Sequence, residues 1–169
     1  INEIKANSKK IKLLFYPGGL LTNGITTAFT NLVNSLPRDK YDITVIIGGR
    51  MSEEKKANVA DFANNVRPMF VFGSKAMTVV EKLKFLSMKL FPLQPLVDAF
   101  YPEAGFKRES KRLLPAMTFD TVIDYSGYSM FPAPFLLEAK ADKRLIYLHN
   151  DMVADANRKI GIHYPLKRN

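Results

Sequence analysis

The fold of this chain is decided by residues 11–36, whose sequence is IKLLFYPGGLLTNGITTAFTNLVNSL. An apolar run from Ile11 to Tyr16 ends at Pro17, which is typical of a buried strand that stops abruptly. Past the glycine turn, apolar side chains recur every three or four residues and predict an amphipathic helix; they are Ile25, Phe29, Leu32, Val33 and Leu36. Thr22 or Asn23 can cap this helix.

This order of strand, glycine turn and helix predicts an anion site. It brings backbone N–H groups to a helix N-terminus, where the helix dipole favours a phosphate. Two precise phosphate motifs are absent, however. The dinucleotide pattern G-x-G-x-x-G does not occur, and Gly24 lacks the Lys-Ser/Thr pair that follows the second glycine of a phosphate loop. The alternative that the glycines only make a tight turn stays open.

Composition narrows the class of partner. The chain has 169 residues, of which 47% are hydrophobic, so we expect one domain with a sizeable core. The net charge of +9 predicts a polyanionic partner, but the basic residues are mostly lysines spread along helices, and we expect no nucleic acid. With no cysteine and two histidines, we expect no metal centre built on thiolates or several imidazoles. No apolar stretch is long enough to span a membrane, so a soluble or peripheral protein is expected.

Further strands and helices alternate along the chain. Strands are predicted at residues 41–47, 69–72, 119–125 and 144–148, and helices from residue 52 and at 74–91, 106–117 and 135–139. This alternation predicts a doubly wound, mainly parallel α/β sheet of the Rossmann-like kind, with helices on both faces. Its ligand crevice lies at the carboxyl ends of the strands. Three segments directly follow strands and should converge there: Gly18-Gly19, Ser126-Gly127-Tyr128 and His149-Asn150-Asp151.

The helix at 74–91 has two apolar faces. Ala76, Val79, Val80, Leu83, Leu86 and Leu90 share the face that we expect to be buried in the core. On the opposite side lie Met77, Phe85 and Met88, bracketed by Lys82, Lys84 and Lys89. Apolar side chains among lysines predict contact with an anionic membrane surface. In the other interpretation, the loop from Pro92 to Pro102 covers them.

Three stretches together resemble a known family. They are Pro17-Gly18-Gly19-x4-Gly24-Ile25, residues 119–129 (FDTVIDYSGYS) and residues 145–151 (LIYLHND). In their order and separation, the chain resembles the N-terminal, acceptor-side half of GT-B glycosyltransferases, specifically the family 4-like bacterial enzymes of cell-surface polymer synthesis, of the teichoic acid or capsule type. The resemblance covers residues 11–151, and it implies that residues 1–169 form one Rossmann-like domain.

The resemblance implies roles for individual residues. Gly18, Gly19 and Gly24 would lie against the diphosphate of a nucleotide-sugar donor, and His149 would be the catalytic residue at the transferred sugar. The acceptor side would be lined by Thr22, Asn23, Ser126, Gly127, Tyr128, Asn150 and Asp151. Two alternatives stay open, in which His149 is structural and Asp151 caps a helix.

In that family, a second domain with an E-x7-E pair holds most of the donor, and this chain has no Glu pair at that spacing. We therefore expect the donor-binding half to be missing and the chain alone to be inactive. An Asp-x-Asp motif, which GT-A transferases use to hold a metal, is absent too, so we expect a metal-independent reaction. The resemblance implies a retaining transfer in which the nucleotide-sugar is the donor substrate and no resident cofactor takes part.

Three functions stay open at this point. The first is the acceptor-side domain of a glycosyltransferase that moves a sugar from a nucleotide-sugar to an anionic polymer or lipid-linked acceptor. This enzyme would act in the cytoplasm, peripherally on the inner face of the cell membrane. The second is a non-catalytic module that binds polymer or a partner within a larger cell-wall synthase. The third is a small flavodoxin-like protein that binds a flavin or nucleotide unaided.

Overall fold

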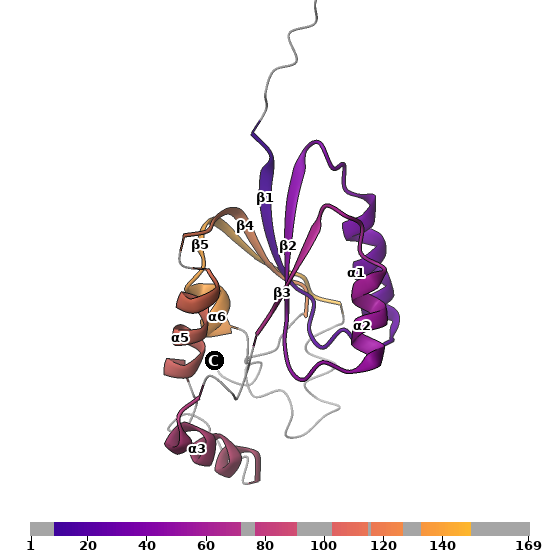
Figure 1. Ribbon diagram of the computed structural model, residues 1–169. Coiled ribbons are helices and arrows are strands. Elements are labelled where there is room, and N and C mark those ends of the chain that lie inside the picture. The colour runs from indigo at the N-terminus through magenta and orange to yellow at the C-terminus, as the bar shows by residue number, and fades with distance from the viewer. Residues whose placement is uncertain (1–8, 72–76, 91–102, 115, 127–132, 150–169) are drawn as a thin grey trace, which may run out of the picture.

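The computed structural model describes residues 9–71, 77–90, 103–114, 116–126 and 133–149. Its strands are β1 (Ile11–Tyr16), β2 (Tyr41–Ile47), β3 (Val66–Phe70), β4 (Thr118–Asp124) and β5 (Lys140–Ile146). They form one five-stranded sheet in the order β3-β2-β1-β4-β5, and every neighbouring pair is parallel (Figure 1). The predicted parallel α/β fold is confirmed, and it is Rossmann-like.

The central strand, β1, is hydrogen-bonded on both sides. Leu14 lies opposite Thr44 of β2 and Val122 of β4, and all three residues are buried. Because both faces of a parallel sheet are covered, its strands carry continuous apolar runs instead of alternating ones. For this reason the predicted bounds of β1 and β2 agree with the observed bounds.

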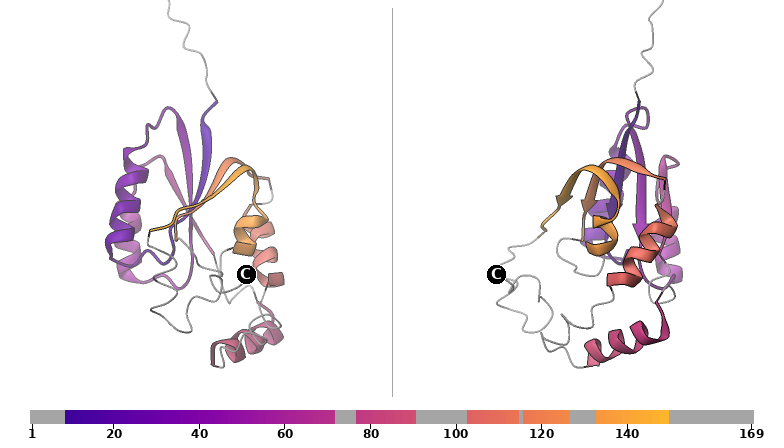
Figure 2. Two further views of the ribbon diagram at one scale, coloured as in Figure 1. Left: turned by 180° about the vertical axis from the view of Figure 1, so that it is seen from behind. Right: turned by 90° about the vertical axis from the view of Figure 1, so that its left-hand side faces the viewer.

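Helices cover both faces of the sheet (Figures 1 and 2). On one face lie α1 (Gly24–Ser35) and α2 (Glu53–Ala60), and on the other lie α5 (Glu103–Leu113) and α6 (Ala133–Leu137). Phe29 of α1 packs against Phe15 of β1 with ring centroids 5.5 Å apart, and Phe135 of α6 is buried in the core of the opposite face. Each such side chain stabilises the fold by about 1.5–3 kcal/mol through burial.

Side chains cap the N-termini of α1 and α2. Asn23 Oδ1 accepts a hydrogen bond of 2.9 Å from the backbone N–H of Thr26, so Asn23, one of the two predicted residues, is the cap of α1. Ser52 accepts from the backbone N–H of Lys55 at 3.3 Å and caps α2. Such caps satisfy N–H groups that have no partner within the first turn of a helix.

The strands at the two ends of the sheet begin earlier than predicted. β3 begins at Val66 and contains Pro68, which we expected to precede the strand. A proline is tolerated there because β3 is at the edge of the described sheet, where one side of the strand makes no ladder hydrogen bonds. β5 begins at Lys140 instead of Arg144, and its first half was missed because charged, mostly exposed residues there hide the strand pattern in the sequence.

The orientation predicted for the helix after β3 is wrong. This helix, α3 (Val79–Leu90), exposes the side chains that we expected in the core; they are Val79, Val80, Leu83, Leu86 and Leu90. Met77, predicted to face outward, is 6% exposed, and Phe85 is half-buried. The reason is its contact with α5, where Met77 packs against Gly105 and Glu81 pairs with Arg108. Ala76 and the side chains of Met88 and Lys89 lie outside the described residues.

In the part of the chain that the structure describes, none of the helices combines the length and apolar character that crossing a bilayer requires. The same residues contain no group of three or more His, Asp or Glu side chains arranged to hold a metal ion.

Candidate functional site

Two of the three predicted segments meet at the carboxyl edge of the sheet. Gly18, in the loop after β1, has φ of +86°, a conformation that favours glycine. A Cβ added at Gly18 would lie 3.4 Å from the Cβ of Ser126, which follows β4. A hollow of about 200 Å³ opens at this contact; it is lined by Pro17, Gly18, Gly19, Leu20, Leu21, Asn23, Ile25, Thr26 and Ser126. The predicted convergence of the β1 and β4 ends is confirmed.

The other two predicted glycines are less constrained than Gly18. A Cβ at Gly19 would meet only Leu21, at 3.9 Å, and at Gly24 it would meet nothing within 4 Å. Gly24 begins α1, so its N–H is among those without a partner inside the helix. The space around Gly24 is therefore open to an incoming group.

The glycine loop is held in place by side chains of α2. Asn58 Nδ2 donates to the backbone oxygen of Leu20 at 3.0 Å, and Glu54 Oε1 accepts from the backbone N–H of Thr22 at 2.6 Å. Leu20 is buried and has φ of 50°, which is uncommon for a bulky residue and shows that its surroundings fix the loop. The sequence analysis missed both α2 residues, since nothing in the pattern indicates that α2 reaches over this loop.

Glu54 brings a negative charge to a loop where we predicted a bound anion. Its hydrogen bonds to Thr22, the one from the backbone N–H foremost, lower the pKa of the Glu54 carboxyl. An arriving phosphate would compete with this carboxylate for the Thr22 N–H. The site is therefore a weaker anion site than its backbone alone suggests.

A buried lysine supplies positive charge at the same edge. Lys55 is 7% exposed, and its Nζ donates to the backbone oxygen of Gly48 at 2.8 Å, just after β2. Gly49 has φ of +79°, and a Cβ there would lie 3.2 Å from the Lys55 Nζ. The glycine turn after β2 thus makes room for an ammonium group that the sequence analysis did not single out.

The ends of β1 and β4 also share a buried carboxylate. Asp124 Oδ1 accepts hydrogen bonds from the backbone N–H and the hydroxyl of Ser126, at 2.9 and 2.6 Å. Burial, and then the charge of Asp124, raise the pKa of Tyr16 to about 12. Asp124 therefore orients Ser126, whose hydroxyl is predicted to line the acceptor side.

His149 is held by the segment that precedes Ser126. Its Nε2 lies 2.6 Å from the backbone oxygen of Tyr125. Because a carbonyl can only accept, Nε2 carries the hydrogen, and in the neutral ring Nδ1 is then the acceptor. The ring packs against those of Tyr125 and Tyr147, with centroids 4.6 and 4.8 Å away. His149 is thus fixed at the carboxyl edge, next to the residue that Gly18 approaches.

The remaining predicted residues divide into two groups. Thr22 and Asn23 lie in the described loop, but Thr22 binds Glu54 through its N–H and Asn23 caps α1. Gly127, Tyr128, Asn150 and Asp151 lie outside the described residues.

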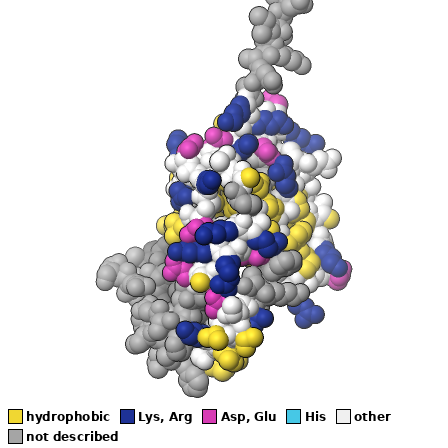
Figure 3. Space-filling model, turned by 60° about the vertical axis from the view of Figure 1, so that its left-hand side comes forward, with side chains coloured by type: hydrophobic (Ala, Val, Ile, Leu, Met, Phe, Trp, Pro, Cys, Tyr) yellow, Lys and Arg dark blue, Asp and Glu magenta, His cyan; other side chains and the backbone are white. Residues whose placement is uncertain are grey.

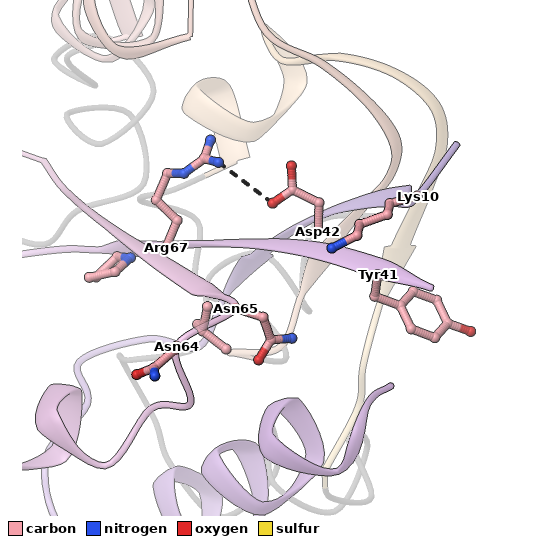
Figure 4. Close-up of a pocket in the computed structure, with 8 residues that line it drawn as sticks. Lys10, Tyr41, Asp42, Asn64, Asn65 and Arg67 are labelled. Carbon is pink, nitrogen blue, oxygen red and sulfur yellow. Dashed lines mark ion pairs between the residues drawn. The ribbon is translucent and has the colours of Figure 1, made fainter. Parts of the chain in front are cut away.

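A larger hollow, of about 330 Å³, lies at the opposite edge of the sheet (Figure 4). Its lining includes Tyr41 and Asp42 at the start of β2 and Arg67 of β3, which pairs with Asp42 at 3.7 Å. In Figure 4 the Asn65 amide points away from this pair, and both of its polar atoms are buried without a hydrogen-bond partner in the described structure. We place the candidate site at the carboxyl edge despite the smaller hollow there, because parallel α/β sheets bind ligands beyond the carboxyl ends of their strands.

Compared with protein-family models, the chain matches none. A comparison with curated proteins gives no match either.

Proposed function

We propose that this chain is the acceptor-side domain of a glycosyltransferase that moves a sugar from a nucleotide-sugar to a cell-surface polymer or a lipid-linked acceptor. One observation carries the proposal. The glycine loop after β1 and Ser126 after β4 meet at the edge where this fold binds ligands, and His149 after β5 is hydrogen-bonded to Tyr125, the residue before Ser126.

The chemistry of sugar transfer needs three things that this edge can supply in part. The departing nucleoside diphosphate needs hydrogen-bond donors, and the first-turn N–H groups of α1 that the Asn23 cap leaves available favour an anion; the ammonium of Lys55 lies at the turn after β2 on the same edge. The acceptor hydroxyl needs orientation, for which the Ser126 hydroxyl lies at the loop. The sugar needs a polar contact, which Nδ1 of His149 can make by accepting from a hydroxyl.

The size of the hollow supports a donor site that is shared between two domains. At about 200 Å³, it is smaller than the roughly 300–1,000 Å³ of pockets that enclose a small-molecule ligand. A nucleotide-sugar would be covered only in part, so we propose that a second domain completes the donor site.

The position of Glu54 favours a second candidate function. A carboxylate on the Thr22 N–H weakens the loop as a diphosphate site. A non-catalytic module that binds polymer or a partner protein would not need that site.

The test uses the full-length protein with a panel of nucleotide-sugars and polymer acceptors, and it measures release of the nucleoside diphosphate. His149→Ala should lower turnover by a factor that corresponds to about 2–4 kcal/mol, the usual cost of one lost transition-state contact. Lys143→Ala, an exposed change on β5, is the control and should leave turnover unchanged. Absence of transfer with every donor would favour the binding module, and near-normal turnover of the His149 variant would assign that residue a structural role.

A further inference from the structure

The outward face of α3 is an apolar stripe, formed by Val79, Leu83, Leu86 and Leu90. Their exposed fractions range from 52% for Leu86 to 72% for Val79. At 3.6 residues per turn, these four side chains fall within roughly 60° of the helix circumference, with exposed Val80 beside them. In Figure 3 hydrophobic side chains gather at the lower end of the molecule, where Figure 1 places α3.

A stripe of this kind is unusual on a surface that meets only water. Single exposed apolar residues are ordinary, but a contiguous apolar patch marks a surface that binds something. The same spacing would bury the stripe if α3 lay on the sheet. Here α3 lies at the end of the molecule, away from the sheet (Figures 1 and 2).

The opposite face of α3 is fixed to the body of the protein. Met77, just before the helix, is buried against Gly105 of α5, and Glu81 forms an ion pair with Arg108 of the same helix. Phe85, on the Glu81 side, is half-buried. Because these contacts hold one face of α3, the apolar stripe is presented outward.

Charge decides which partner this stripe fits. Exposed Lys82 lies along one side of the stripe, and exposed Lys84 lies on the other side, beyond Val80. The one acidic residue of α3, Glu81, is engaged on the inner side by Arg108. The whole chain carries a net charge of +9. An apolar stripe between lysines is the arrangement of a helix that lies in the headgroup region of an anionic membrane.

We propose that α3 docks the protein on an anionic lipid surface. The apolar stripe enters the boundary between headgroups and acyl chains, while Lys82 and Lys84 meet the headgroup phosphates. This is the face opposite to the one that the sequence predicted for membrane contact. The inference does not depend on the proposed sugar transfer, since it concerns a different surface.

The test measures co-sedimentation of the full chain with vesicles. Vesicles of equal parts phosphatidylglycerol and phosphatidylcholine should retain the protein at low salt, less of it at high salt, and vesicles of phosphatidylcholine alone should retain little. The paired variant Leu83→Gln with Leu86→Gln should lose most of the retention, because glutamine keeps the helix propensity of leucine but removes the apolar surface.

A charge-matched pair separates docking through α3 from a general attraction of a basic protein. Lys82→Glu with Lys84→Glu should lower the partition coefficient by roughly tenfold or more. Lys40→Glu with Lys143→Glu makes the same change in net charge at exposed positions away from α3 and should lower it much less. Equal losses in the two pairs would overturn the proposal.

Thermal unfolding of the leucine variant tests whether the chain itself, instead of lipid, covers the apolar stripe. If lipid is the partner, Leu83→Gln with Leu86→Gln should leave the Tm of the free protein unchanged, since the stripe meets only water there. A large fall in Tm would show that the chain itself covers the stripe. Undiminished retention of the same variant on anionic vesicles would show that the stripe does not bind lipid and would favour a protein partner. Either result would overturn lipid docking.

Discussion

Gly18 is the residue that lets the loop after β1 reach the end of β4. Its φ of +86° lies in the left-handed region, and a Cβ there would be in van der Waals contact with Ser126. Replacing Gly18 by alanine should lower the free energy of unfolding by about 1–2 kcal/mol, the cost of placing an L-residue in that conformation. Urea denaturation measures this cost.

Gly24→Ala is the control for that change. It adds the same methyl group at the start of α1, where nothing lies within 4 Å of the new Cβ. Alanine should be neutral there or stabilise the helix by up to about 1 kcal/mol. Equal destabilisation by both variants would show that the backbone of Gly18 is not under the constraint described above.

Glu54 sets the charge that an anion meets at the Thr22 N–H. Glu54→Gln keeps an oxygen acceptor for that N–H but removes the negative charge. If the loop binds the diphosphate of a donor, this variant should bind pyrophosphate roughly two- to fivefold more tightly at constant ionic strength, as expected for an exposed charge. Titration calorimetry of wild type, Glu54→Gln and Glu53→Gln compares the three, and Glu53, which pairs with Lys56 instead, should have no such effect. Tighter binding by both variants would remove Glu54 from the site.

At the scale of elements, the central strands and the helices could be predicted from the sequence, and the orientation of α3 could not. The apolar runs of β1 and β2 fix their own bounds, because both faces of a parallel sheet are buried. The period of α3 shows only that its apolar residues share one face. Which face meets the body depends on Met77, Glu81 and their partners on α5, which are far away in the sequence.

The candidate site, too, could be predicted from the sequence only in part. That Gly18, Ser126 and His149 should lie at one edge follows from a general property of parallel sheets, because each residue comes after a strand. The roles of Glu54, Asn58 and Lys55 depend on how α2 lies over two loops. No spacing in the sequence encodes that contact.

The attachment of α3 to α5 should weaken in acid. The hydrogen bond from Arg108, and then that from the backbone N–H of Thr78, lower the pKa of Glu81 from 4.5 to about 2. A carboxyl whose pKa is depressed by folding stabilises the folded state above its unfolded pKa, so this stabilisation is complete above about pH 4.5 and is lost as the pH falls toward 2.

The Tm of the wild type should therefore fall between pH 5 and pH 2 more steeply than that of Glu81→Gln, which has no charge to lose in this window. Differential scanning calorimetry across that range gives both curves. Glu53→Gln, at an exposed pair on α2, controls for the loss of one carboxylate. Parallel curves for wild type and Glu81→Gln would rule out this ion pair as the cause.

At the scale of the whole molecule, the described hollow is too small to enclose a nucleotide-sugar, so this chain alone should transfer no sugar. It should still bind a nucleoside diphosphate weakly, with NMR shift changes confined to the amides of residues 18–26 and Ser126. Robust turnover by the isolated chain would contradict the two-domain proposal, and shift changes around Arg67 instead would place the binding site at the opposite edge of the sheet.

β5 bears on how the protein behaves in concentrated solution. In the described sheet it is an edge strand, and Leu145 and Ile146, which point to opposite faces, are both more than half exposed. Such an edge is a template on which a second copy can add a strand. The same strand carries exposed Lys140, Lys143 and Arg144, so two copies that approach edge to edge repel each other. Salt screens this repulsion, so self-association should be weakest at low ionic strength and should increase as salt is added.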